Sequence, residues 1–260
     1  MFNNIFSGYS VLRFIHRTIL CFLVFTVFMV DEQITHADTL LINNVTVIDA
    51  TGSLPKSGMS VLVADGVIKS IQPVVKITKP AGSTVIDASG MFLIPGLWDM
   101  HVHANYGFFL PLFIANGVTG VREMWGRDIH HKWRKRIGEK GFISPRFYIA
   151  SIIIDGDPPV WPGSIGVKDA EQARKEVDKF YKLGADFIKV YSRLNRPSYF
   201  AIADECKKLG IPFAGHVPNS VSAAKASTAG QKSIEHLTGI NTANNDAKAK
   251  ELYQLFIKKE

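Results

Sequence analysis

The stretch Pro95-Gly96-Leu97-Trp98-Asp99-Met100-His101-Val102-His103, residues 95–103, marks a change in the pattern of the chain. Before it, residues 38–94 are typical of short β-branched strands joined by turns, with a strong hairpin signal at Asp65-Gly66. After it, strand-like apolar runs alternate with helical segments, which predicts βαβ units and a parallel sheet. We therefore expect an α/β protein in which a small β-sandwich region, residues 38–94, precedes a second region, residues 95–260.

The second region resembles part of a barrel. Its expected strands are 97–101, 118–123, 147–153, 187–191, 212–216 and 233–236, and helices are expected at 169–183, 197–209 and 221–229. Gly184, Gly210 and Gly230 follow these helices, where a left-handed cap is favoured. A closed (β/α)8 barrel needs eight units and about 250 residues. The pattern therefore predicts a partial TIM barrel with about six of the eight units.

Composition excludes several classes of protein. The chain has 260 residues, of which 47% are hydrophobic and 20% charged, so disordered and collagen-like classes are excluded. The net charge of +7 is spread along the chain, and the densest basic segment, residues 130–136, is typical of a solvated helix face with His130 and His131 exposed. The sequence contains no recognisable nucleic-acid-binding motif beside these charges, so the net charge does not predict nucleic-acid binding.

The first 37 residues have the pattern of a secretory signal peptide. Arg13 and Arg17 precede an apolar run over residues 19–30, and residues 35–37 offer a small-residue cleavage site. The run is shorter than the roughly 20 residues of a membrane-spanning helix. We expect export to the periplasm or beyond, with no stable membrane span after cleavage; the alternative is an uncleaved N-terminal membrane anchor.

Histidines end three of the expected strands. His101 and His103 are two apart on one strand and therefore face the same side. His216 and His236 end two later strands. Because the carboxyl ends of parallel barrel strands form the face that carries active sites, we expect these four imidazoles to meet there. Neutral imidazole is a favoured ligand of zinc and similar metals.

Lys189 is the other unusual residue, because it lies inside an apolar strand. Burial of a lone ammonium is costly and lowers its pKa. A neutral amine in a closed pocket can react with carbon dioxide to form a carbamate, an anionic oxygen ligand able to bridge two metal ions. The alternative is a lysine whose amine reaches solvent at the strand end or pairs with an acid.

The stretch 95–103 closely resembles the first-strand metal signature of the amidohydrolase superfamily. Residues 184–191, 215–218 and 233–237 resemble that family's fourth, fifth and sixth strands, in the same order. The nearest branch is that of secreted amidohydrolases similar to imidazolonepropionase and Xaa-Pro dipeptidase. The resemblance covers residues 40 to 240, and the ordered set of four motifs carries it.

The resemblance implies a site with one or two divalent metal ions, usually zinc. His101 and His103 would hold the first ion, His216 and His236 the second, and the carbamate of Lys189 would bridge both. It implies that metal-activated hydroxide attacks a C–N bond of an amide, cyclic amide or dipeptide. Lys189, His216 and His236 would be the catalytic residues, and the substrate a small amide or peptide-like molecule.

One element of the family pattern is absent from this sequence, an aspartate at the end of the eighth strand. We therefore expect a fragment of a longer enzyme; the alternatives are a short protein that assembles with a partner and a non-catalytic metal-binding or interaction protein. Arg122 and Glu123 end the second strand and are expected to form a structural ion pair or to orient substrate. The sequence leaves open the substrate, the metal and the oligomeric state.

Overall fold

The computed structural model describes residues 39–240 and divides the chain into two compact units, Met1–Pro95 and Gly96–Glu260. The predicted signal peptide, residues 1–37, lies outside the described residues. Among the residues that are described, no helix is both long and apolar enough to cross a membrane.

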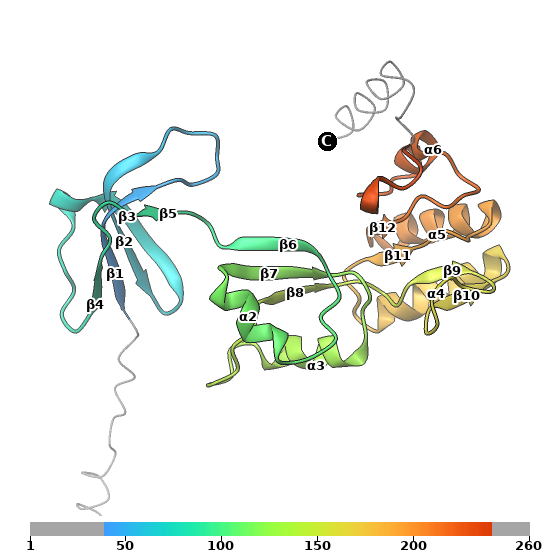
Figure 1. The fold of residues 1–260 in the computed structure, drawn as a ribbon, viewed down its shortest axis with the longest axis horizontal. Helices are drawn as coiled ribbons and strands as arrows, with labels where there is room; N and C mark the ends of the chain where they lie inside the picture. The colour runs from blue at the N-terminus through green and yellow to red at the C-terminus, as the bar shows by residue number, and fades with distance from the viewer. Residues whose placement is uncertain (1–38, 241–260) are drawn as a thin grey trace, which may run out of the picture. The chain divides into compact units, whose positions relative to one another are not determined.

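The first unit is a five-stranded sheet (Figure 1). Its strands are β1 (Leu40–Val47), β2 (Lys56–Ala64), β3 (Val67–Pro73), β4 (Thr84–Asp87) and β5 (Phe92–Leu93), with a short 3-10 helix at Val74–Lys76. The order is β3-β2-β1-β4; β1, β2 and β3 pair antiparallel, and β4 and β5 pair parallel to β1. The predicted hairpin at Asp65-Gly66 is confirmed, because both residues have the positive φ that this tight turn requires, 54° and 70°.

The second unit contains parallel strands with helices between them, which confirms the predicted α/β class. One sheet has the order β6 (Leu97–Val102), β7 (Val118–Glu123), β8 (Arg146–Ile149), and the other the order β10 (Ile165–Val167), β9 (Ile154–Gly156), β11 (Ile188–Val190), β12 (Phe213–Gly215). A parallel bridge between Ala150 and Phe187 connects the two sheets where β8 ends and β11 begins. The described strands do not close into a barrel, so the partial barrel stays a prediction.

Five helices are described, and the three expected at 169–183, 197–209 and 221–229 are among them. The five are α2 (Phe109–Ala115), α3 (Asp128–Arg136), α4 (Ala170–Lys182), α5 (Arg196–Leu209) and α6 (Ala223–Thr228). Side-chain oxygens of Asp169, Asn195 and Ser222 accept hydrogen bonds from backbone amides in the first turns of α4, α5 and α6 and so fix where these helices begin. Gly184, Gly210 and Gly230 have positive φ, as predicted.

The sixth expected strand, residues 233–236, is the clearest difference. It contributes a single parallel bridge, between Gly215 and Ile234, and then turns into a 3-10 helix, η2 (Glu235–Leu237). His236 and Leu237 both have a φ of 55°, which ends any extended strand. This turn decides which side chains reach the site described below.

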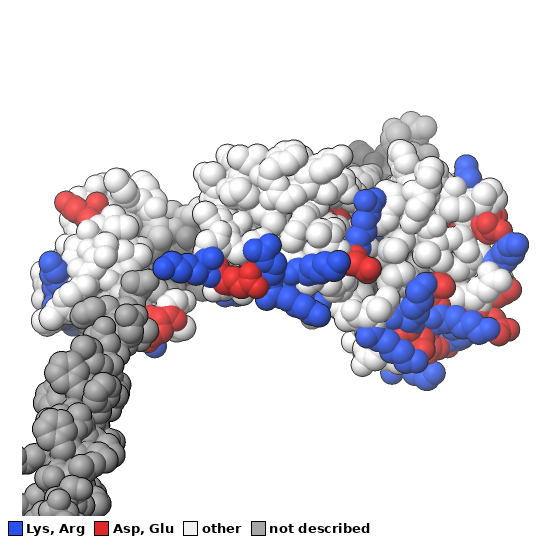
Figure 2. All heavy atoms as spheres, turned by 90° about the horizontal axis from the view of Figure 1, so that it is seen from below, with Lys and Arg blue, Asp and Glu red and all other residues white. Residues whose placement is uncertain are grey.

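Acidic and basic side chains are mixed on the face of the molecule drawn in Figure 2. In this view from below, Lys and Arg side chains are interleaved with Asp and Glu. On α4, the ion pairs Lys175–Glu171, Lys179–Glu176 and Lys182–Asp178 also place opposite charges next to each other. On this face the charges do not form a continuous basic stripe of the kind that a nucleic-acid backbone attracts.

Candidate active site

The predicted ligand residues surround one pocket. It has a volume of about 460 Å³, within the usual range for small-molecule sites. Its lining consists of His101, His103, Asn105, Trp125, Arg127, Ile153, Trp161, Lys189, Tyr191, His216 and His236. All of these residues belong to the second unit. The structure therefore brings the five predicted ligand residues together, although they lie on four separate parts of the chain.

Strand β6 positions the first two histidines by simple alternation. Val102 and Ala104 are buried in the core, whereas His101 and His103 face the pocket. The rings of His101 and His103 lie with their centroids 5.3 Å apart. Because the two histidines are two residues apart, both imidazoles lie on the same wall of the pocket.

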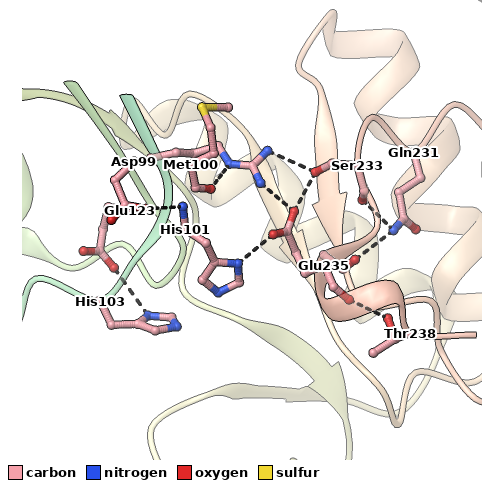
Figure 3. Close-up of polar contacts among 11 residues, drawn as sticks. Asp99, Met100, His101, His103, Glu123, Gln231, Ser233, Glu235 and Thr238 are labelled. Carbon is pink, nitrogen blue, oxygen red and sulfur yellow. Dashed lines mark hydrogen bonds and ion pairs between the residues drawn. The ribbon is translucent and has the colours of Figure 1, made fainter. Parts of the chain in front are cut away.

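The carboxylate of Glu235 forms a hydrogen bond with the imidazole of His101, as Figure 3 shows. Oε2 of Glu235 lies 2.6 Å from Nδ1 of His101, and Oε1 lies 2.6 Å from Nη2 of Arg122. The hydroxyl of Ser233 donates a further hydrogen bond of 2.6 Å to Oε1. Burial raises the pKa of Glu235, but the hydrogen bonds from His101 and Ser233 and the charge of Arg122 outweigh it and hold the pKa at about 2. Glu235 is therefore an ionised, buried carboxylate.

A second buried carboxylate, Glu123, organises the loop after β6. It accepts hydrogen bonds from the backbone amides of Ala104, at 2.7 Å, and Trp125, at 2.9 Å. Nδ1 of His103 lies 3.7 Å from it, as Figure 3 shows, and Nε2 of His130 lies 3.5 Å away. Arg122 and Glu123 thus have separate partners: Arg122 forms a structural ion pair with Glu235, and Glu123 lies near His103 and His130.

His130 corrects another expectation, because it is completely buried rather than exposed. Its Nδ1 accepts from the backbone amide of Arg127 at 3.0 Å, and its Nε2 lies 3.0 Å from the carbonyl oxygen of Ala104. The basic run around it misled the prediction, because the helix α3 turns one face inward and buries only His130 and Trp133. The imidazole is therefore a structural link between α3 and the loop after β6.

Lys189 lies on β11 with only 1% of its surface exposed. Within the described part of the chain, no hydrogen bond or ion pair to its amine is present, although the residue lines the pocket. Burial lowers the pKa of the Lys189 amine to about 8; the charge of Glu235 opposes this shift, and that of Arg122 adds to it. A substantial fraction of the amine is then neutral near pH 8, which is the form that can react with carbon dioxide.

His216 follows β12 and is also largely buried. Its Nδ1 lies 2.9 Å from the hydroxyl of Ser192, and its ring stacks on Tyr191 with centroids 4.0 Å apart. Burial lowers the pKa of His216 to about 4, and the charge of Lys189 acts in the same direction. The ring is therefore neutral at pH 7, the form that binds metal.

Gly215 makes room for this arrangement. It has a φ of 139°, and a Cβ at this position would lie 2.1 Å from the carbonyl oxygen of Val190. The backbone of β12 can therefore approach β11 closely only because this residue has no side chain. The close approach sets His216 beside Lys189 at the end of the sheet.

His236 completes the group from η2. Its ring lies 4.5 Å from that of His101 and 5.3 Å from that of His216, measured between centroids. On an extended strand, neighbouring residues would face opposite sides. The left-handed φ of His236 lets Glu235 and His236 both reach the same cluster. For this reason simple alternation along the sequence could not reveal Glu235 as a site residue.

The donor set fits a divalent metal ion in its chemistry. Four imidazoles and an unpaired buried amine share one pocket, and imidazole and carbamate oxygen are ligands that zinc accepts. Over residues 39–240, no group of three or more His, Cys, Asp or Glu side chains is already arranged to hold an ion. The described side chains therefore form a pocket lined with suitable donors, in which His101 is engaged by Glu235.

The remaining wall of the pocket is aromatic. Trp125, Trp161 and Tyr191 line it, and the indole of Trp161 donates a hydrogen bond of 2.7 Å to the hydroxyl of Tyr191. The guanidinium of Arg127 lies 4.9 Å from the ring of Trp125.

Comparison with known proteins adds independent evidence for the fold. No family model matches the chain. The solved structure of bottromycin amidohydrolase is 27% identical, with a TM-score of 0.68 over 85% of this chain and 48% of that one. The chain resembles amidohydrolases. Molinate hydrolase shares the fold of this chain. It is 17% identical, with a TM-score of 0.70 over 86% of this chain and 62% of that one. A Xaa-Pro dipeptidase shares the fold too, at 20% identity and a TM-score of 0.67 over 85% of this chain and 65% of that one.

Shorter sequence matches agree with this amidohydrolase resemblance. An adenine deaminase from Paracoccus denitrificans is 39% identical over 61 residues, 24% of this chain and 10% of that protein. A dihydroorotase from Pelobacter propionicus is 41% identical over 64 residues, 25% of this chain and 14% of that protein. The chain thus spans about half the length of the bottromycin enzyme, and its matches cover small parts of these two relatives.

Proposed function

We propose that this chain carries the metal-binding half of an amidohydrolase that hydrolyses a C–N bond in a small amide or dipeptide-like substrate. The observation that supports the proposal most directly is the meeting of His101, His103, Lys189, His216 and His236 around one pocket. The similarity to bottromycin amidohydrolase supports the same class of chemistry. We further propose that the parallel strands belong to a (β/α)8 barrel and that residues 1–37 direct export.

In this proposal His101, His103, His216, His236 and the carbamate of Lys189 would hold one or two divalent ions. The carbamate forms when the neutral amine attacks carbon dioxide, creating an N–C bond and releasing one proton to solvent. The lowered pKa of Lys189, about 8, supports this step because it supplies the neutral amine. A bound divalent ion supplies Lewis acidity toward a carbonyl oxygen and toward water.

The chain's own residues then bind and orient the substrate. The aromatic wall of Trp125, Trp161 and Tyr191 excludes water from the apolar part of the substrate. The guanidinium of Arg127 stands over Trp125, and no ion pair to it is present among residues 39–240. We propose that it favours substrates that carry an anionic group, such as the carboxylate of a dipeptide.

The test is metal analysis of the purified chain after incubation with zinc and bicarbonate. We expect up to two zinc ions per chain, loss of metal in Lys189→Ala, and partial recovery when a short carboxylic acid is added to that variant. A panel of amides and dipeptides then measures turnover. A chain that keeps only trace metal under these conditions contradicts the proposal, and full metal binding without turnover favours a non-catalytic metal-binding protein.

A further inference from the structure

We propose that Glu235 is a positioning residue that fixes His101 in a single tautomer, with the proton on Nδ1 and the lone pair of Nε2 left for a ligand. The tautomer follows from the contacts of the metal-free protein alone. Only its consequence for metal affinity rests on the proposed function.

The first step is the geometry of the Glu235 carboxylate, shown in Figure 3. Its side chain is 7% exposed, and its oxygen Oε1 already accepts from Arg122 and Ser233, each at 2.6 Å. Oxygen Oε2 faces Nδ1 of His101 at 2.6 Å. Because Arg122 is always a cation and a carboxylate beside it stays ionised, Glu235 can only accept hydrogen bonds. The hydrogen of this contact must therefore be on Nδ1 of His101.

The second step is the rigidity of the partners. Nε of Arg122 donates to the carbonyl oxygen of Met100 at 2.7 Å, and Nη1 donates to the hydroxyl of Ser233 at 3.0 Å. The guanidinium is thus tied to β6 and to the segment before η2 at the same time. Met100 directly precedes His101, so the same network fixes the backbone that carries the imidazole. The Glu235 carboxylate therefore has fixed partners in Arg122 and Ser233, and it stays in place if the imidazole of His101 rotates.

The third step is comparison with the other imidazoles of the pocket. Nδ1 of His216 contacts the hydroxyl of Ser192, which can donate or accept and so does not select a tautomer. Nδ1 of His103 lies 3.7 Å from Glu123, beyond the range of a hydrogen bond. Among these three imidazoles, His101 has the contact that selects one tautomer. Ligand histidines in metal sites are commonly oriented by such a carboxylate.

The experiment uses the whole chain labelled with 15N-histidine, free of metal, at pH 8. Two-bond 1H–15N correlation spectra distinguish the Nδ1–H tautomer from the Nε2–H tautomer, and the missing signal of His101→Asn assigns His101. We expect the Nδ1–H tautomer in the wild type. In Glu235→Gln we expect a mixture of tautomers, because an amide can donate as well as accept.

The matched control is Glu205→Gln. Glu205 is a carboxylate of similar burial, with a side chain 9% exposed against 7% for Glu235, but its partners are Arg174 and Lys208 rather than an imidazole of the pocket. We expect His101 in this control to keep the wild-type spectrum. An Nε2–H tautomer in the wild type overturns the proposal, as does a His101 signal that is unchanged in Glu235→Gln. If Glu235→Gln fails to fold, the wild-type spectrum alone decides.

Zinc titration then separates this proposal from the proposed function. Loss of a carboxylate that orients a ligand histidine typically weakens metal binding by about 10- to 100-fold. We expect this loss in Glu235→Gln and a change within about twofold in Glu205→Gln. A protein that binds no zinc, yet shows the expected tautomer, contradicts the metal centre and leaves the role of Glu235 intact. Equal zinc affinities of wild type and Glu235→Gln contradict the positioning role in metal binding.

Discussion

The conformation of His236 shows how a single residue shapes the pocket. Its φ of 55° is left-handed, a conformation that costs a residue with a Cβ roughly 1–2 kcal/mol. Such strain is commonly found at functional sites, where the surrounding structure enforces it. Here it turns two adjacent side chains, Glu235 and His236, toward the same group of imidazoles. A strand that continued through residue 236 would have placed one of them on the opposite face.

This strain predicts that His236→Gly separates stability from function. The side chain of His236 is exposed, so its removal gives up little packing. We expect the free energy of unfolding of the metal-free protein to stay unchanged or to rise by up to about 1 kcal/mol, while zinc binding weakens. The measurement is urea denaturation in the presence of a chelator.

His103→Gly is the control, because His103 is also exposed but is not among the residues with positive φ. Glycine there should lower stability by roughly 0.5–1 kcal/mol. Equal losses in both variants would show that the left-handed conformation of His236 carries no strain.

At the scale of helices and strands, the local sequence pattern was enough to predict the positions of several elements of the second unit. The apolar spacing and polar caps of α4 and α5 place both helices within a residue or two of the prediction, because these signals act over one or two turns. The prediction of a strand at 233–236 was wrong because the conformation of this segment depends on contacts with Arg122 and His101, which are far away in sequence. Lys189 could be singled out from sequence because one charge within an apolar strand is conspicuous, whereas Glu235 beside His236 is not.

The contact between α4 and α5 predicts a pH dependence of stability. Glu205 on α5 accepts from Arg174 of α4 at 3.1 Å and from Lys208 at 2.9 Å. The hydrogen bond from Lys208 and then that from Arg174 lower the pKa of Glu205 below its usual range, against the opposing effect of burial. A lowered pKa in the folded state stabilises the protein above the unfolded pKa, and this contribution disappears as pH falls through the folded pKa.

We therefore expect Glu205→Gln to be less stable than wild type at pH 7, with the difference shrinking below about pH 4.5, the region where the unfolded carboxyl takes up its proton. Urea denaturation of both proteins at pH 7 and pH 3.5 measures it. A difference in unfolding free energy that is equal at both pH values would show that the carboxylate charge of Glu205 does not contribute to stability.

For the second unit as a whole, the arrangement of parallel strands agrees with the expected order, but closure of a barrel is a property of all its strands together. The bridges Ala150–Phe187 and Gly215–Ile234 continue the parallel order from β8 through β11 and β12 to residue 234. Strand β6 pairs with β7 and, within the described residues, with no other strand. Its residues Trp98 and Met100 are 49% and 52% exposed.

An exposed apolar strand edge of this kind promotes association. We expect the chain to self-associate as its concentration rises, and Met100→Lys to reduce this association because a lysine on an edge strand opposes strand pairing. Sedimentation velocity over a range of concentrations measures the effect. Leu112→Lys on α2 is the control, since Leu112 is also 52% exposed but lies on a helix. If both lysines act equally, edge pairing through β6 is not the cause.

The contact between His101 and Glu235 forms late during synthesis of the chain, because its two partners are far apart in sequence. Its two partners are 134 residues apart in the chain, so at a synthesis rate of about 5–20 residues per second the imidazole leaves the ribosome roughly 7–27 s before its carboxylate. During that interval His101 is present without the group that orients it. A nascent chain therefore cannot form this contact before residue 235 has left the ribosome.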